Sequence, residues 1–348
     1  MFDRLYRRFS NDIGIDLGTA NTLVYLKRHG IVISEPSVVA VNQKTGTIVA
    51  VGREAKDMQG RTPGHIKTIR PLVEGVVSDF EMTEEMLAYF IRKAEKLSKK
   101  FFRPRVVIGV PSGITNVEMR AVYDAAINAG AREVHLVEEA MAAALGVRLP
   151  VLEATGSFVV DIGGGTTDIA LIALGGIVRS LNLRIAGDHF NTALIEYLRD
   201  EFKLLVGEQT AEGIKIALGS AIETDYMELE VRGRDMVTGL PRSLIITDGD
   251  VREALRYPLS LLVVGIREVL ETSPPEMLSD IITSGIVLTG GGSLLHGLAT
   301  LLSAELKLPI YVADDPLTAV ARGTGVILED FKKHQSVLLS LETYAEVR

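Results

Sequence analysis

The chain has 348 residues, and its 37 Lys and Arg against 45 Asp and Glu give a formal charge of −8. Hydrophobic residues make up 47% and charged residues 24%, which is the composition of a folded protein with substantial cores and excludes a disordered one. Its length suggests two domains or one large bilobal one. Because the chain has no cysteine, disulfides, thiol catalysis and cysteine-ligated zinc are excluded, and a reducing compartment is favoured. The acidic balance argues against bulk electrostatic binding to nucleic acid or membrane, but it does not exclude a local basic patch.

The sequence contains no candidate transmembrane span. Its longest apolar stretches, such as Leu259–Ile266, fall well short of the roughly 20 residues that a bilayer requires. The N-terminal residues MFDRLYRRFS interleave charged and apolar side chains, whereas a secretory signal carries a continuous apolar region. The sequence therefore predicts a cytoplasmic protein.

After residue 10, short strands and helices alternate. Strands are expected over Asp12–Leu17, Thr22–Lys27 and Gly30–Ser34, followed by a hairpin of Val38–Asn42 and Ile48–Gly52. A helix with Thr83 as its N-cap should bury a stripe that runs from Met86 to Leu97. Further elements are expected as a strand over Arg105–Val110 and helices over Asn116–Ala129 and Glu139–Leu145.

The second half of the chain repeats this opening. In both halves an apolar strand ends in the tripeptide Asp-Leu-Gly or Asp-Ile-Gly. Small residues and a Thr then lead into a second apolar strand. Asp16 lies 14 residues before the Gly30 turn, and Asp161 lies 14 residues before Gly175. The two aspartates are 145 residues apart, which is a domain-sized interval. The pattern predicts an internal duplication of a supersecondary unit.

The repeated turns have the composition of a polyphosphate site. Such a site needs glycines whose backbone N–H groups converge on the anion, hydroxyl donors, and carboxylates that hold Mg²⁺ through water. The segments Asp16–Asn21 and Asp161–Asp168 each supply all three. A third glycine cluster, Leu288–Ser293, would let a nucleoside approach the backbone closely. Two such turns from two homologous halves would face each other and hold the phosphates between them.

Competing motifs are absent from the sequence. The chain contains no Gly-Lys dipeptide, which excludes a Walker A loop, and no G-x-G-x-x-G. Its six histidines show no metal-ligand spacing. Ser112 lacks the G-x-S-x-G context of a nucleophile elbow.

These motifs together resemble the MreB family of bacterial actins, within the actin, Hsp70 and sugar kinase ATPase superfamily. The segments that carry the resemblance are Asp16–Leu23, Gly60–Gly64, Ile69–Asp79, Glu138–Ala144, Asp161–Thr167, Thr289–Gly292, Ala313–Leu317 and Ala321–Gly325. The resemblance implies an α/β, actin-like bilobal ATPase fold, with two duplicated lobes, mixed sheets flanked by helices and a nucleotide cleft between them. Lobe I would comprise residues 11–148 and 315–348, with a small insertion subdomain at 33–65. Lobe II would comprise residues 149–314, with an insertion subdomain at 186–248.

The resemblance also assigns roles to matching residues. Asp16 and Asp161 would hold Mg²⁺ mainly through water, and Glu139 would position or activate the water that attacks ATP. From the residues alone, Glu138 and Glu139 are equally good candidates. The residues expected to bind the nucleotide are Gly18, Thr19, Ala20, Asn21, Gly163, Gly164, Gly165, Thr166, Thr167, Glu212, Lys215, Gly290, Gly291, Gly292 and Ser293. Three residues depart from the family pattern. Ala140 stands where Pro is usual, Asp168 where Glu is usual, and Gly213 where the family has a longer side chain.

Two segments combine aromatic and cationic residues. Near the N-terminus, apolar side chains recur at helical spacing with arginines between them: Phe2, Leu5, Tyr6 and Phe9. This pattern predicts an amphipathic membrane-binding helix over residues 1–10. Phe101 and Phe102, flanked by cations, are a second candidate, because an exposed pair of this kind is costly in water. A frayed terminus and a buried aromatic pair are the alternatives, and the resemblance favours membrane contact at both places.

The resemblance implies an ATP-dependent cytoskeletal protein. It would assemble with itself into filaments on the cytoplasmic face of an anionic membrane and determine cell shape by organising the proteins of cell-wall elongation. Slow ATP hydrolysis would gate the state of the filament. Three alternatives remain: a sugar or acetate kinase, which needs a base and polar contacts for a metabolite; an Hsp70-like chaperone, for which no peptide-binding domain is evident; and a scaffold that binds ATP without turnover.

Overall fold

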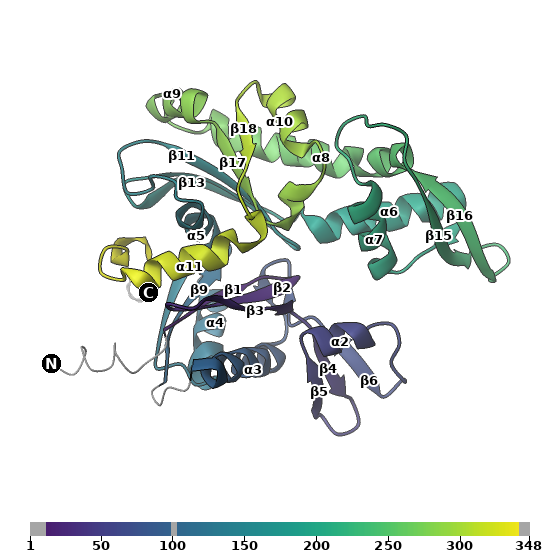
Figure 1. Cartoon of the computed structure of the whole chain (residues 1–348), viewed down its shortest axis with the longest axis horizontal. Coiled ribbons are helices and arrows are strands. Elements are labelled where there is room, and N and C mark those ends of the chain that lie inside the picture. Colours follow the sequence, from purple (N-terminus) through teal and green to yellow (C-terminus); the bar gives the residue numbers. More distant parts are fainter. Residues whose placement is uncertain (1–11, 99–102, 341–348) are drawn as a thin grey trace.

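The structure, a computed structural model, describes residues 12–98 and 103–340 (Figure 1). The predictions for residues 1–10 and for Phe101 and Phe102 lie outside these residues. Two five-stranded mixed sheets, in the orders β10-β9-β1-β2-β3 and β13-β12-β11-β17-β18, form the centres of lobe I and lobe II. The strands of lobe I are β1 (Ile13–Leu17), β2 (Asn21–Leu26), β3 (Gly30–Pro36), β9 (Arg105–Val110) and β10 (Glu133–Glu138). Those of lobe II are β11 (Ser157–Ile162), β12 (Thr167–Ala173), β13 (Gly176–Leu183), β17 (Ile286–Thr289) and β18 (Ile310–Val312).

The two sheets share one topology, and this confirms the predicted duplication. β1 pairs antiparallel with β2 and parallel with β9, and β11 pairs in the same way with β12 and β17. Even the register agrees. Asp16 stands opposite Leu23, and Asp161 stands at the equivalent place opposite Asp168.

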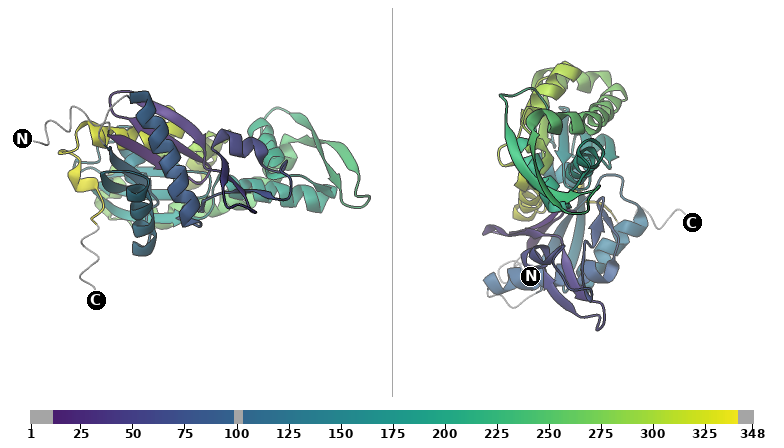
Figure 2. Two further views of the ribbon diagram at one scale, coloured as in Figure 1. Left: turned by 90° about the horizontal axis from the view of Figure 1, so that it is seen from below. Right: turned by 90° about the vertical axis from the view of Figure 1, so that its right-hand side faces the viewer.

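Each lobe also carries a smaller outer unit. The unit of lobe I contains β4 (Val39–Asn42), β5 (Ile48–Val51), α2 (Arg53–Met58) and β6 (Ile66–Ile69). The unit of lobe II contains α6 (Gly187–Phe202), β14 (Leu204–Leu205), α7 (Glu208–Leu218), β15 (Glu228–Asp235) and β16 (Pro241–Thr247). Figures 1 and 2 show lobe II stacked on lobe I, with both outer units at the same end of the molecule.

Helices flank both sheets. They are α3 (Phe80–Ser98), α4 (Asn116–Asn128), α5 (Glu139–Gly146), α8 (Asp248–Glu271), α9 (Pro275–Ser284), α10 (Leu298–Leu306) and α11 (Ala319–Glu329), besides the small hairpin of β7 (Leu72–Val73) and β8 (Val76–Val77). Within the part of the chain that the structure describes, no helix has the length and apolarity needed to span a membrane.

The lobes exchange one helix each. α5 follows the last strand of the lobe I sequence repeat but packs on β11 and β12 of lobe II, whereas α11 follows β18 and packs on β1, β2 and β9 of lobe I. The two helices touch backbone to backbone. A Cβ on Gly146 would lie 1.9 Å from the carbonyl oxygen of Ala319, and one on Gly323 would lie 1.7 Å from that of Ala142. Only glycine permits this crossing, which builds a third apolar core with side chains from both lobes.

Most of the expected strands lie within two residues of their predicted ends, but the start of α3 was predicted wrongly. The helix begins at Phe80, because Asp79 rather than Thr83 caps it. The Asp79 carboxylate accepts a hydrogen bond from the backbone N–H of Met82 at 3.1 Å. Thr83 is buried inside the helix, and its hydroxyl donates to the Asp79 carbonyl. The predicted stripe is buried except for Leu97, which is 59% exposed.

Candidate nucleotide site between the lobes

The two repeated glycine turns meet face to face. A Cβ on Gly164 would lie 2.5 Å from the Cβ of Ala20, and one on Gly165 would lie 2.7 Å from Oγ1 of Thr19. Any side chain at these two positions would therefore push the turns apart. The structure thus brings together the two segments that the sequence analysis assigned to phosphate binding, one from each lobe.

The start of α6 lies against the second turn. The backbone N–H groups of Gly187 and Asp188 donate to the carbonyls of Gly163 and Gly164 at 3.2 and 2.7 Å. Lys215 donates from Nζ to the carbonyl of Gly187 at 3.0 Å and to Glu212 at 2.7 Å. Glu212 and Lys215, which come from α7, therefore belong to the surroundings of the second turn.

The third glycine cluster packs on the end of β11. A Cβ on Gly290 would lie 2.3 Å from the carbonyl oxygen of Ile162, and one on Gly292 would lie 2.3 Å from its Cγ2. The hydroxyl of Ser293 donates to the carbonyl of Gly290 at 2.6 Å. All three glycine clusters named in the sequence analysis consequently lie beside Ile162 and the turn that follows it.

Four carboxylates converge beside these turns. Burial raises the pKa of Asp16 to about 8, and the charge of Asp161 adds to this rise. Burial raises the pKa of Asp161 to about 7, against the hydrogen bond that it accepts from Thr289 at 2.7 Å. Burial raises the pKa of Glu139 well above its usual value, reinforced by Asp168, Asp16 and Asp161. Unbalanced negative charge of this kind is what a divalent cation compensates.

The donor set fits a hydrated Mg²⁺. Within residues 12–98 and 103–340, no group of three or more His, Asp or Glu side chains is arranged to hold a metal ion directly. Mg²⁺ commonly keeps several waters and binds through one or two carboxylates together with substrate phosphates. Asp16 and Asp161 provide two carboxylates that interact with each other beside the glycine turns.

The structure separates the two glutamates that the sequence left equivalent. Glu139, the first residue of α5, is 8% exposed and interacts with Asp16 and Asp161. Glu138 is the last residue of β10, and burial raises its pKa while the backbone of Gly113 opposes the rise. Only Glu139 is affected by both aspartates.

The three departures from the family pattern have different surroundings. Ala140 is fully buried in α5. A Cβ on Gly213 would meet no atom within 4 Å, so the exposed face of α7 has room for a longer side chain. Asp168 accepts hydrogen bonds from the backbone N–H of Ser112 at 2.6 Å and from Nδ2 of Asn182 at 3.0 Å.

A set of ion pairs joins the two outer units, and the sequence did not predict it. Arg70, which follows β6, contacts Asp188 at 3.0 Å and Glu208 at 2.6 Å across the lobes. We call these three residues the interlobe clamp. A more exposed pair, Arg184 with Glu74 at 3.1 Å, lies beside the clamp residues in sequence. Arg70 falls within the Ile69–Asp79 segment that carries the family resemblance, and this was the only signal for it.

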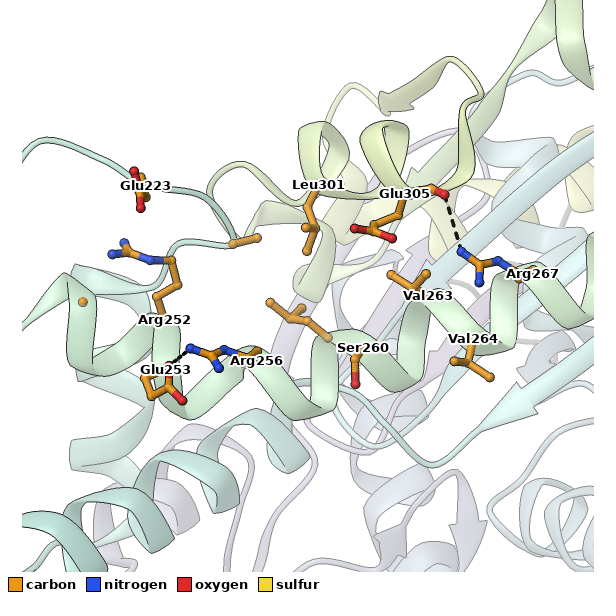
Figure 3. Close-up of a pocket in the computed structure, with 13 residues that line it drawn as sticks. Glu223, Arg252, Glu253, Arg256, Ser260, Val263, Val264, Arg267, Leu301 and Glu305 are labelled. Atoms are coloured by element: carbon orange, nitrogen blue, oxygen red, sulfur yellow. Dashed lines mark hydrogen bonds and ion pairs between the residues drawn. The ribbon is translucent and has the colours of Figure 1, made fainter.

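A separate cavity of about 650 Å³ lies on lobe II between α8 and α10 (Figure 3). Its charged side chains are largely engaged, since Arg256 pairs with Glu253, and Arg267 donates to the carbonyl of Glu305. Its lining has none of the three glycine clusters and none of the four converging carboxylates. The nucleotide prediction therefore stays with the glycine turns.

Known MreB and Mbl proteins resemble this chain in both sequence and structure. A family profile described as MreB/Mbl protein matches residues 10–336. The chain is 51% identical to the cell shape-determining protein MreB of Escherichia coli, with 98% of this chain and 100% of the relative aligned. It is 49% identical to the cell shape-determining protein Mbl of Bacillus cereus, over 93% of this chain and 98% of the relative. The crystal structure of MreB5 of Spiroplasma citri bound to ADP superposes with a TM-score of 0.89 at 36% identity, over 94% of this chain and 98% of the other.

Proposed function

The chain belongs to the MreB/Mbl family, and on that premise we propose that it is an ATP-dependent, actin-like cytoskeletal protein. It assembles with itself into membrane-associated filaments that determine cell shape by organising the proteins of cell-wall elongation. Its place is the cytoplasm, peripheral on the inner face of the cell membrane. Lobe I comprises residues 11–148 and 315–348, and lobe II comprises residues 149–314. This division counts α11 with the sheet on which it packs and α5 with the strand that it follows.

One observation supports nucleotide binding most directly. Gly164 and Gly165 of lobe II lie so close to Ala20 and Thr19 of lobe I that a Cβ on either glycine would clash. Half-buried Asp16 and buried Asp161 stand near the ends of the strands that lead into these turns. Backbone N–H groups and hydroxyls from both turns would hold the phosphates. Glu212, Lys215 and the segment 290–293 would border the nucleoside. A bound Mg²⁺ would screen the charge of the phosphates.

Glu139 is the residue proposed for hydrolysis. It accepts a hydrogen bond from the attacking water and orients that water toward the terminal phosphate. Its burial and its three aspartate neighbours favour uptake of a proton. As the family resemblance implies, hydrolysis should be slow.

The sheet topology supports membrane association at one edge of lobe I. β1 and β9 are parallel neighbours, with Ile13 opposite Val106, so both strands start at the same end of the sheet. Exposed cations lie at this end: Arg28, Arg103, Lys332 and Lys333. The Phe331 ring beneath the guanidinium of Arg105, 4.2 Å away, connects the turn around Lys332 to the start of β9.

The nucleotide and filament proposals are tested by phosphate release and electron microscopy of the purified protein with Mg²⁺ and ATP. We expect slow phosphate release and filaments whose formation depends on ATP. Unassembled particles under all conditions would contradict the cytoskeletal proposal. Transfer of phosphate to a sugar or to acetate rather than to water would favour the kinase alternative.

The membrane proposal is tested by sedimentation with vesicles of phosphatidylcholine and phosphatidylglycerol. The double variant Arg28→Glu with Lys332→Glu should lose most vesicle binding, whereas Lys44→Glu, the same type of change at the exposed turn between β4 and β5, should retain it. One subunit has little apolar surface to insert, so binding should also depend on assembly. Equal pelleting of an assembly-deficient variant and the wild type would contradict that dependence.

A further inference from the structure

Ser112 lies in the turn that follows β9 of lobe I and is only 4% exposed. Its backbone N–H donates to Oδ1 of Asp168 in lobe II at 2.6 Å, so the turn is fixed across the lobes. The side chain of Ser112 also contacts the Asp168 carboxylate, but its hydroxyl makes no well-aligned hydrogen bond to any described residue. A buried hydroxyl that points its proton toward a carboxylate keeps lone pairs that accept hydrogen bonds, so the Ser112 oxygen is placed to accept one from a bound water.

The turn stands among the groups assigned to hydrolysis. A Cβ on Gly109, two residues before Pro111, would lie 3.4 Å from Cγ of Glu139. A Cβ on Gly75 would lie 2.6 Å from Cγ of Pro111 and 3.2 Å from Cγ2 of Thr166. Ser112 is therefore adjacent to the strand end that contacts Glu139, to the second phosphate turn and to Asp168.

Asp168 is suited to hold this arrangement. It is fully buried, and its two carboxylate oxygens accept from the backbone of Ser112 and from Asn182. Asp168 thus ties the turn of lobe I to β12 and β13 of lobe II. Separation of the lobes would break the bond to Ser112 and move the hydroxyl away from Glu139.

We propose that the Ser112 hydroxyl binds the attacking water together with Glu139, and that Asp168 is the positioning residue that sets this pair when the lobes are closed. The inference rests on the proposed ATP hydrolysis. The water oxygen forms a bond to the terminal phosphorus while the bond from that phosphorus to the bridging oxygen breaks. The electron pair of the broken bond leaves on ADP. One proton of the water passes to Glu139 and then to the released phosphate.

The test is single-turnover phosphate release by the full chain with Mg²⁺ and ATP. Ser112→Ala should slow the rate constant about tenfold, which is the value of one hydrogen bond made in the transition state. ATP affinity and the melting temperature should not change. Ser112→Thr, which keeps a hydroxyl, should recover most of the rate. Ser303→Ala is the matched control, because Ser303 lies in α10, away from the turns, and its hydroxyl donates to the carbonyl of Leu308.

A second comparison distinguishes water positioning from a structural effect. In a Glu139→Gln background, Ser112→Ala should cause little further loss, because both residues act on one water. A full additional tenfold loss, or an unchanged rate for Ser112→Ala alone, would overturn the inference and leave the ATPase proposal intact. Absence of phosphate release by the wild type would overturn both, and Asp168→Ala with undiminished rate would remove Asp168 from the positioning role.

Discussion

The two lobes have the same topology and different chemistry at equivalent positions. Opposite Asp16 in lobe I stands Leu23, an apolar residue buried in the core, whereas opposite Asp161 in lobe II stands Asp168, which binds the other lobe. On the parallel side, Gly109 neighbours Asp16, and Thr289 neighbours Asp161 and donates to it. The lobe II aspartate therefore has polar partners that the lobe I aspartate lacks.

The exchanged helices differ in the same way. α5 begins with Glu139, which is buried beside three aspartates. The segment before α11 offers Asp315 at the comparable place, but this residue is exposed and accepts a hydrogen bond from Thr318 within its own turn. The two lobes thus share one sheet geometry, but the buried acid at a helix start is found at α5 and not at α11.

The largest expected effect tests this asymmetry. Glu139→Gln should lower the rate of phosphate release by about a hundredfold or more, because a general base contributes roughly that much. Asp315→Asn should leave the rate unchanged. Single-turnover phosphate release measures both variants, and equal losses would show that the two helix starts act alike.

The next effect concerns the crossing of the exchanged helices. Gly323→Ala should lower the free energy of unfolding by about 3 kcal/mol, since its Cβ would meet a backbone carbonyl that cannot move aside. Gly213→Ala lies on the open face of α7 and should stabilise the protein slightly through helix propensity. Urea denaturation compares the two. A tolerated Gly323→Ala would mean that the helices separate more easily than their contact indicates.

A smaller effect is expected at the interlobe clamp. Arg70→Ala should speed ATP dissociation about tenfold, because it removes two ion pairs between partly buried side chains. Arg184→Ala should change the dissociation rate less than about twofold, since exposed pairs contribute little, and its side chain is 68% exposed. Stopped-flow displacement of a fluorescent ATP analogue gives both rates. Equal rates for the two variants would show that the clamp holds the lobes together no better than the exposed pair does.

The smallest effect is a pH dependence of stability in the protein without nucleotide or Mg²⁺. The carboxyls of Asp16 and Asp161 have pKa values of about 8 and about 7 when folded, against the ordinary 3.8. Between these limits the folded state binds more protons than the unfolded state, so stability falls as pH rises from about 4 to about 8. The melting temperature should decrease by a few degrees from pH 6 to pH 8. The double variant Asp16→Asn with Asp161→Asn should have a flatter profile.

The repeated local pattern made much of the fold predictable. Asp16 and Asp161 each end an apolar strand at the same spacing from a glycine turn, and this alone indicated two equivalent sheets and two facing turns. The start of α3 was not fixed by pattern, because Asp79 and Thr83 are both good N-caps and packing selected the first. The clamp and the contact of Ser112 with Asp168 join residues far apart in sequence. No local periodicity encodes such contacts, so they required the structure.

The backbone contact between α5 and α11 has a mechanical consequence. Two helices that touch at glycines cannot slide past each other, but they can turn about the point of contact. Helices α5 and α11 lie on the side of the molecule away from the two outer units (Figure 1). A rotation of a few degrees at this pivot is therefore amplified along the length of each lobe. A small change in the separation of the two glycine turns would therefore displace the outer units by a larger distance.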